Sequence, residues 1–73
     1  MKIDPRGLSF VEWADRLVGA TSYDLPRASR VGWQQWAAEV LEVPQIAAQN
    51  PPRPEGYPDW RMWAEDFNRT VEL

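Results

Sequence analysis

The chain has 73 residues and a formal charge of −3, and it contains neither cysteine nor histidine. It is therefore long enough for one domain at most, and disulfides, thiolate or imidazole metal sites and histidine-based catalysis are excluded. A domain of this size buries only about 60% of its unfolded surface, so its core needs extra support. Five tryptophans, two phenylalanines and two tyrosines predict that aromatic packing supplies that support.

One sequence pattern, aromatic-x-x-Trp-Ala-x-x-apolar, occurs three times, starting at Phe10, Trp33 and Trp60. Its apolar positions follow the i, i+3, i+4, i+7 spacing of a single helix face. An alanine beside each indole lets a neighbouring helix approach closely. The pattern predicts three helices whose tryptophans converge.

The first helix is predicted over 9–18. Ser9 and Glu12 have the spacing of a capping box, and Gly19 is suited to the position just past the helix end.

A loop over 20–28 precedes the second predicted helix, 29–42, which we expect to start near Ser29. Gly32 would then lie in its first turn and weaken it. Pro44 ends this helix or starts a short fourth helix over 44–49.

A connector over 50–58 holds four of the seven prolines and is expected to be extended. Asp59 can cap the third repeat helix, predicted over 59–72. Because no capping signal follows it, its last turn should fray unless another group holds it.

These elements predict an all-α fold, a small three-helix bundle with a possible short fourth helix, in a single domain spanning 1–73. The expected core consists of the stripe residues of the three helices: Phe10, Trp13, Ala14, Leu17, Trp36, Ala37, Val40, Leu41, Trp60, Trp63, Ala64, Phe67 and Val71.

Catalytic patterns are missing from the sequence. The serines have no histidine to activate them, and the neighbouring carboxylates lie on predicted polar helix faces. There is no phosphate-binding glycine loop or calcium-binding loop. We therefore predict a non-enzymatic protein without catalytic residues, cofactor or metal. Scattered arginines and a negative net charge also argue against nucleic-acid binding.

The terminus at Met1 lacks the apolar region of a signal peptide, and no run approaches about 18 apolar residues. No membrane association is expected.

Six residues are candidates for contact with a partner protein or a second copy. Val11 and Met62 are apolar at positions where the helix pattern predicts polar residues, although scattered exposed apolar residues are also normal. Trp33 could leave an indole edge exposed, whereas its place on the stripe favours the core. Arg27, Arg30 and Arg53 could form a basic rim or be solvated surface residues.

The segment Pro51-Pro52-Arg53-Pro54 matches a PxxP motif, although a stiff spacer packed on indoles is the favoured interpretation.

Two stretches of the sequence resemble segments of small tryptophan-rich proteins of tailed bacteriophages. They are Trp33-Gln34-Gln35-Trp36-Ala37 and Tyr57-Pro58-Asp59-Trp60-Arg61-Met62-Trp63-Ala64. The resemblance covers the repeat cores and implies a virion, connector or accessory structural protein. The alternative that it implies is a regulator that binds and inhibits a host protein. The expected location is the host cytoplasm or the virion.

Overall fold

A computed structural model describes residues 3–28 and 32–72. The described residues form four α-helices and no strand: α1, Phe10–Ala20; α2, Trp33–Val40; α3, Pro44–Ala47; and α4, Trp60–Thr70. The predicted all-α class is confirmed.

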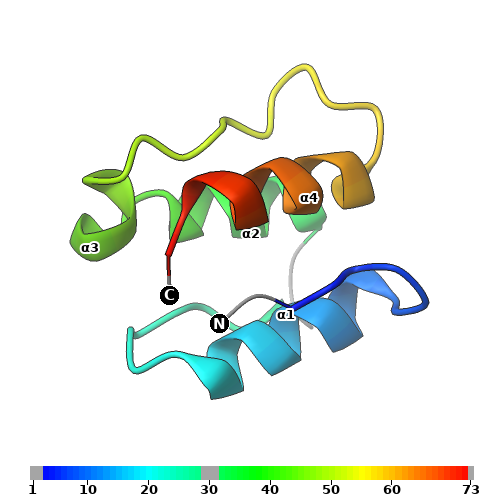
Figure 1. The fold of residues 1–73 in the computed structure, drawn as a ribbon, viewed down its shortest axis with the longest axis horizontal. Helices are drawn as coiled ribbons and strands as arrows, with labels where there is room; N and C mark the ends of the chain where they lie inside the picture. Colours follow the sequence, from blue (N-terminus) through cyan, green and yellow to red (C-terminus); the bar gives the residue numbers. More distant parts are fainter. Residues whose placement is uncertain (1–2, 29–31, 73) are drawn as a thin grey trace.

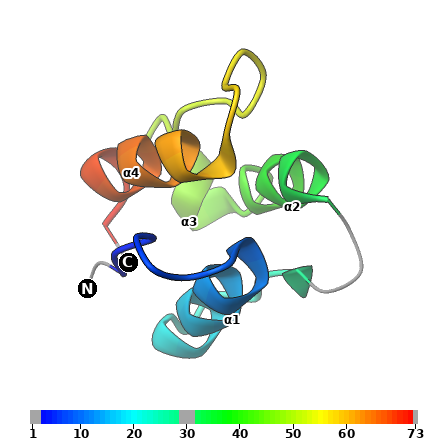
Figure 2. The ribbon, with the colours of Figure 1, turned by 90° about the vertical axis from the view of Figure 1, so that its right-hand side faces the viewer.

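The three longer helices surround a common centre. Seen end-on, α1, α2 and α4 lie at three corners, and the short α3 lies behind them (Figure 2). The proline-rich connector starts beside α3 at one end of the molecule and returns along α2 and α4 to the start of α4 (Figure 1). This return brings the connector against the outer side of two helices.

The start of α1 follows the predicted capping box. The Ser9 hydroxyl accepts the Glu12 backbone N–H at 3.2 Å, and the Glu12 carboxylate accepts the Ser9 backbone N–H at 2.9 Å. The prediction for Gly19 was wrong, because α1 continues through Gly19 to Ala20. Thr21 ends the helix in an extended conformation, so no left-handed glycine is needed there.

Helix α2 is shorter than the predicted 29–42. It begins at Trp33 with Gly32 as its N-cap in an extended conformation, so Gly32 does not weaken the first turn as expected. The predicted start at Ser29 lies outside the described residues.

Beyond Val40 the chain tightens into a turn, in which the Val43 N–H donates to Val40 O at 3.1 Å. Pro44 is the first residue of α3, since a missing N–H costs nothing there.

Helix α4 ends at Thr70, two residues before the predicted boundary. Asp59 is its N-cap residue, but the Asp59 side chain makes no capping hydrogen bond. Past the helix, the Gln49 side-chain amide donates to Glu72 O at 3.1 Å and accepts the Glu72 N–H at 2.8 Å. This two-point contact holds the chain just beyond the helix end that the sequence left without a cap.

Three indoles meet at the centre of the core. Trp13, Trp36 and Trp63 occupy the same position of the three repeats, and each is fully buried. Their ring centroids are 5.7, 6.1 and 6.3 Å apart, and their planes are inclined by 75°, 85° and 89°. Such edge-to-face pairs are favoured by the ring quadrupoles, each by about 0.5–1.5 kcal/mol beyond area burial. The predicted convergence of the tryptophans is therefore present.

Each central indole also binds the chain segment that precedes its own helix. Nε1 of Trp13 donates to Ile3 O at 2.9 Å, Nε1 of Trp36 to Pro26 O at 2.7 Å, and Nε1 of Trp63 to Pro52 O at 2.8 Å. The acceptors lie ten, ten and eleven positions before the donors. Two residues after each acceptor comes a buried side chain: Pro5, Ala28 and Pro54.

The structural repeat is thus longer than the helix pattern. It consists of an extended segment, a buried small or proline residue and the helix, with the indole N–H joining the two ends. This bond also satisfies a polar group that would otherwise be costly to bury.

Two of the repeats share a glycine turn before the helix. In each, a proline carbonyl accepts an N–H three residues later at 3.3 Å: Pro5 from Leu8, and Pro54 from Tyr57. The third turn residue is Gly7 in one repeat, with φ +80°, and Gly56 in the other, with φ +90°. Only glycine adopts these angles without strain.

The core differs from the predicted set at a few positions. Phe10 and Leu41 are half-buried at the edge of the core, where Phe10 lies against Trp36 with ring centroids 5.4 Å apart. Leu25, Ala28 and Ile46 are buried and were not expected, because they come from the loop and from α3 and follow no helix stripe.

Candidate protein-binding surface

Met62 and Val11 are the large apolar side chains that stay exposed among the described residues, by 51% and 39% respectively. Met62 lies in the first turn of α4, and Val11 lies at the start of α1. Val11 follows Phe10 by one residue, and Met62 follows Trp60 by two. The rotation of the helix therefore points both side chains away from the core.

Trp33 is half-buried, and its ring lies against that of Trp63 with centroids 6.2 Å apart. The indole is thus largely an outer layer of the core, with one part left at the surface. Of the two interpretations of Trp33, core packing describes most of its contacts.

The candidate basic rim is not assembled in the described part of the chain. Arg53 lines a surface groove, described below, together with Glu42 and Glu55. Arg27 is exposed and does not line that groove. Arg30 lies outside the described residues.

The segment Pro51–Pro54 is built into the fold. Pro54 is buried, Pro51 and Pro52 are half-buried, and the Pro52 carbonyl accepts the Trp63 indole N–H. These contacts fit the spacer interpretation, because an SH3-type ligand would need its prolines free.

A groove of about 320 Å³ lies between α2, α3 and the proline-rich connector. Three separate segments form it, and the connector closes one side by returning over α2. We call it the connector groove. Its lining comprises the apolar or small residues Ala38, Leu41, Ala47, Pro51 and Pro54 and the polar residues Glu42, Asn50, Arg53 and Glu55.

One residue that lines the connector groove, Asn50, has an unusual backbone conformation. Asn50 has φ +56°, a left-handed conformation that asparagine tolerates better than most residues. The Asn50 N–H donates to Ala47 O at 3.2 Å, and this contact ends α3. The chain therefore turns sharply here and enters the connector.

A second hollow of about 330 Å³ lies on the other side of α2 and shares Glu42 with the connector groove. Asp24 and Glu39 also line it, together with Leu25, Pro26 and Val43. The two hollows beside α2 are consequently lined by the carboxylates of Asp24, Glu39, Glu42 and Glu55, with Arg53 as the cation that lines the connector groove.

Arg61 fixes the surface around Met62. Its guanidinium lies 4.8 Å from the centroid of the Trp60 ring, and Nη2 donates to Leu8 O at 2.8 Å. The bond joins the first turn of α4 to the segment before α1. A cation stacked on an indole and tied to a carbonyl has little freedom left, so this part of the surface is preorganised.

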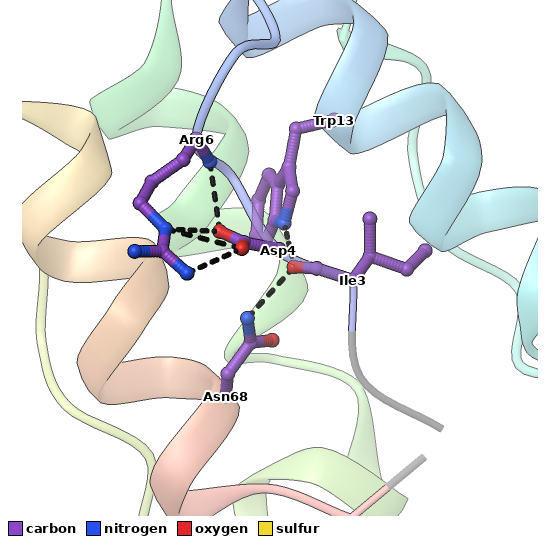
Figure 3. Close-up of polar contacts among 5 residues, drawn as sticks. All are labelled: Ile3, Asp4, Arg6, Trp13 and Asn68. Carbon is purple, nitrogen blue, oxygen red and sulfur yellow. Dashed lines mark hydrogen bonds and ion pairs between the residues drawn. The ribbon is translucent and has the colours of Figure 1, made fainter.

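The Ile3 carbonyl links helices α1 and α4 through hydrogen bonds. It accepts Trp13 Nε1 from α1 and Asn68 Nδ2 from α4, at 2.9 and 2.8 Å (Figure 3). Beside it, the Asp4 carboxylate receives Nη2 of Arg6 at 2.9 Å. The Arg6 hydrogen bonds lower the pKa of Asp4, and the Asp4 carboxylate raises that of Arg6.

Other carboxylates also have structural partners. The Ser9 backbone N–H and then the Ser9 hydroxyl lower the pKa of Glu12. Asp66 accepts the Tyr57 hydroxyl at 2.6 Å and also binds Arg69. Within residues 3–28 and 32–72, no group of three or more acidic residues is placed to hold a metal ion.

Most of the connector groove could not be identified from the sequence. Arg53 was singled out, but Ala38 and Ala47 carry no signal of their own. Asn50 just before two prolines marks the end of a short helix, and that is the nearest available clue.

The helices of the described segments are too short and too polar to cross a bilayer. No protein-family model matches the chain, and no curated protein or solved structure is similar to it.

Proposed function

We propose that this chain is a non-enzymatic protein-binding or assembly module that docks a partner in the connector groove. The observation that carries the proposal is the composition of the groove, whose lining combines apolar or small residues with charged residues of both signs. Partner side chains commonly anchor in pockets of this kind, where a polar rim surrounds an apolar centre.

Two carboxylates serve the fold. Glu12 caps a helix, and Asp66 holds Tyr57 and Arg69, so each stabilises the fold. No nucleic-acid target is proposed, because the two hollows beside α2 are lined by carboxylates that would repel phosphates.

Within this class we favour a small phage virion, connector or accessory structural protein, located in the particle or in the host cytoplasm. The phage assignment depends on the resemblance of the tryptophan-rich stretches 33–37 and 57–64 to phage proteins. A three-helix bundle is the fold that we propose for the module, since α1, α2 and α4 each contribute one of the three central indoles.

The alternative function is a phage-encoded regulator that binds and inhibits a host protein. Both roles use the same groove, but they differ in the partner that it contacts. An assembly subunit contacts its own copies or other particle proteins, whereas a regulator contacts one host protein.

Site-specific photocrosslinking tests the proposal. Gln35, exposed on α2 one turn before Ala38 and outside the groove lining, is replaced by p-benzoylphenylalanine in the full chain, and crosslinking is performed in the native host. Asp15, exposed on α1, carries the same probe as a control. We expect the Gln35 probe to give one defined adduct, identified by mass, that disappears when Ala47→Arg fills the groove. Identical adducts from both positions, or none from Gln35, would show that the connector groove docks no protein.

A further inference from the structure

We propose that the connector groove receives Met62 from a second copy of this chain. This inference rests on the proposed function and specifies its partner. Met62 is the more exposed of the two large apolar side chains at the described surface, and the groove is a hollow whose lining includes Leu41, Pro51 and Pro54. The chain therefore carries both a protruding side chain and a site that can accept it.

Size and flexibility suit Met62 to this site. The groove offers about 320 Å³, and the small side chains of Ala38 and Ala47 are part of its lining. An unbranched thioether adapts to irregular apolar gaps, which is why methionine is common at binding surfaces. Val11, the other exposed apolar residue, is shorter and branched at Cβ, so it cannot reach into a recess as deeply.

The charges around Met62 match those around the connector groove. Arg61 precedes Met62, and Glu65 follows one turn later, so a cation and an anion flank the methionine. At the groove, Glu42 and Glu55 can pair with such a cation, and Arg53 with such an anion. Because Trp60 and Leu8 hold Arg61, its other N–H groups can meet a carboxylate at little entropic cost.

The protruding residue and the groove have no residue in common, since Met62 does not line the groove. Each copy can therefore donate Met62 to one neighbour and accept Met62 from another or from the same one. A single side chain and a few rim pairs make a small interface, so we expect a dissociation constant on the order of 0.1 mM.

Sedimentation velocity gives the first test, from about 10 µM to about 1 mM protein. The wild type should associate with rising concentration. Met62→Gln and Ala38→Arg should each weaken association at least tenfold. Val11→Thr and Ala20→Arg are matched controls, because they make similar changes at exposed sites outside the groove. Far-UV circular dichroism checks that every variant is folded.

Crosslinking between two variants gives the second test and does not depend on stoichiometry. The chain has no cysteine, so introduced thiols are unique. An Asp59→Cys copy, which keeps Met62 and places the thiol three residues before it, is mixed with a Glu42→Cys copy and treated with a short bismaleimide. We expect the mixed dimer to form at least tenfold faster than in a Val11→Cys and Glu42→Cys mixture.

A wild type that remains monomeric at the highest concentration would overturn this inference, as would equal crosslinking rates in the two mixtures. The proposed function is tested separately by the Gln35 photocrosslink. If that adduct contains a different protein, the groove binds a partner and only the second-copy inference fails.

Discussion

Trp33 and Trp36 lie one turn apart on α2, yet their surroundings differ. Trp36 is fully buried among Phe10, Trp13 and Trp63 and donates a hydrogen bond to Pro26 O. Trp33 is half-buried, and its ring lies against that of Trp63.

We expect Trp36→Ala to destabilise the fold by about 3–5 kcal/mol, which is comparable to the whole stability of so small a domain. Trp33→Ala should cost only about 1–2 kcal/mol, because less area and one ring pair are lost. Urea melts followed by circular dichroism would measure both. A Trp36→Ala melt that overlays the wild type would mean that the three indoles do not form the core.

The Glu12 cap should make stability depend on pH. Hydrogen bonds to Ser9 lower the folded-state pKa of Glu12 below its ordinary value of 4.5. The stabilisation is therefore fully present above pH 4.5 and is lost as the pH falls through the folded-state pKa. Denaturant midpoints measured at pH values from neutral to acidic should decline over this range.

Glu12→Gln is the control for the cap. The amide oxygen can still accept the Ser9 N–H but does not titrate, so the decline should be shallower than in the wild type. Asp4 retains its own titration in both proteins, because its pKa is also lowered. Equal slopes for the two proteins would assign the acid sensitivity to groups other than Glu12.

Among the elements, the glycines of the turns and the glycine within α1 have opposite requirements. Gly7 and Gly56 have positive φ, and an added Cβ at either position meets no atom within 4 Å. Alanine there is therefore disfavoured by backbone strain alone, and we expect Gly7→Ala and Gly56→Ala each to cost about 1 kcal/mol or more.

Gly19→Ala is the internal comparison. Gly19 lies inside α1, and its added Cβ also meets no atom within 4 Å, so alanine should stabilise the helix by about 0.5–1 kcal/mol. Thermal melts of the three variants would show opposite signs. Destabilisation by Gly19→Ala would mean that α1 ends before this residue, as the sequence suggested.

The elements also show which helix boundaries can be predicted. The start of α1 was predictable because Ser9 and Glu12 form a local, reciprocal contact. The end of α1 was not, because Gly19 is compatible both with a helix end and with a helix interior. The start of α2 shows the same difficulty, since Gly32 serves as its N-cap without any side-chain signal.

At the scale of the whole molecule, the repeat predicted which residues meet at the centre. Trp13, Trp36 and Trp63 were identifiable because they share one position of a helical stripe. The connector groove was not predictable, because it depends on how the chain returns from Asn50 over α2. Leu25 and Ile46 illustrate the same point, since their burial comes from tertiary packing and no local pattern marks it.

The bonds between each central indole and a carbonyl ten or eleven residues earlier have a consequence for folding kinetics. Closing a loop of about ten residues takes on the order of 10–100 ns, far less than bringing distant segments together. Each repeat can therefore form the hydrogen bond between its indole and its own preceding segment before it packs against the other two repeats. The slow step is then the joining of three partly ordered units.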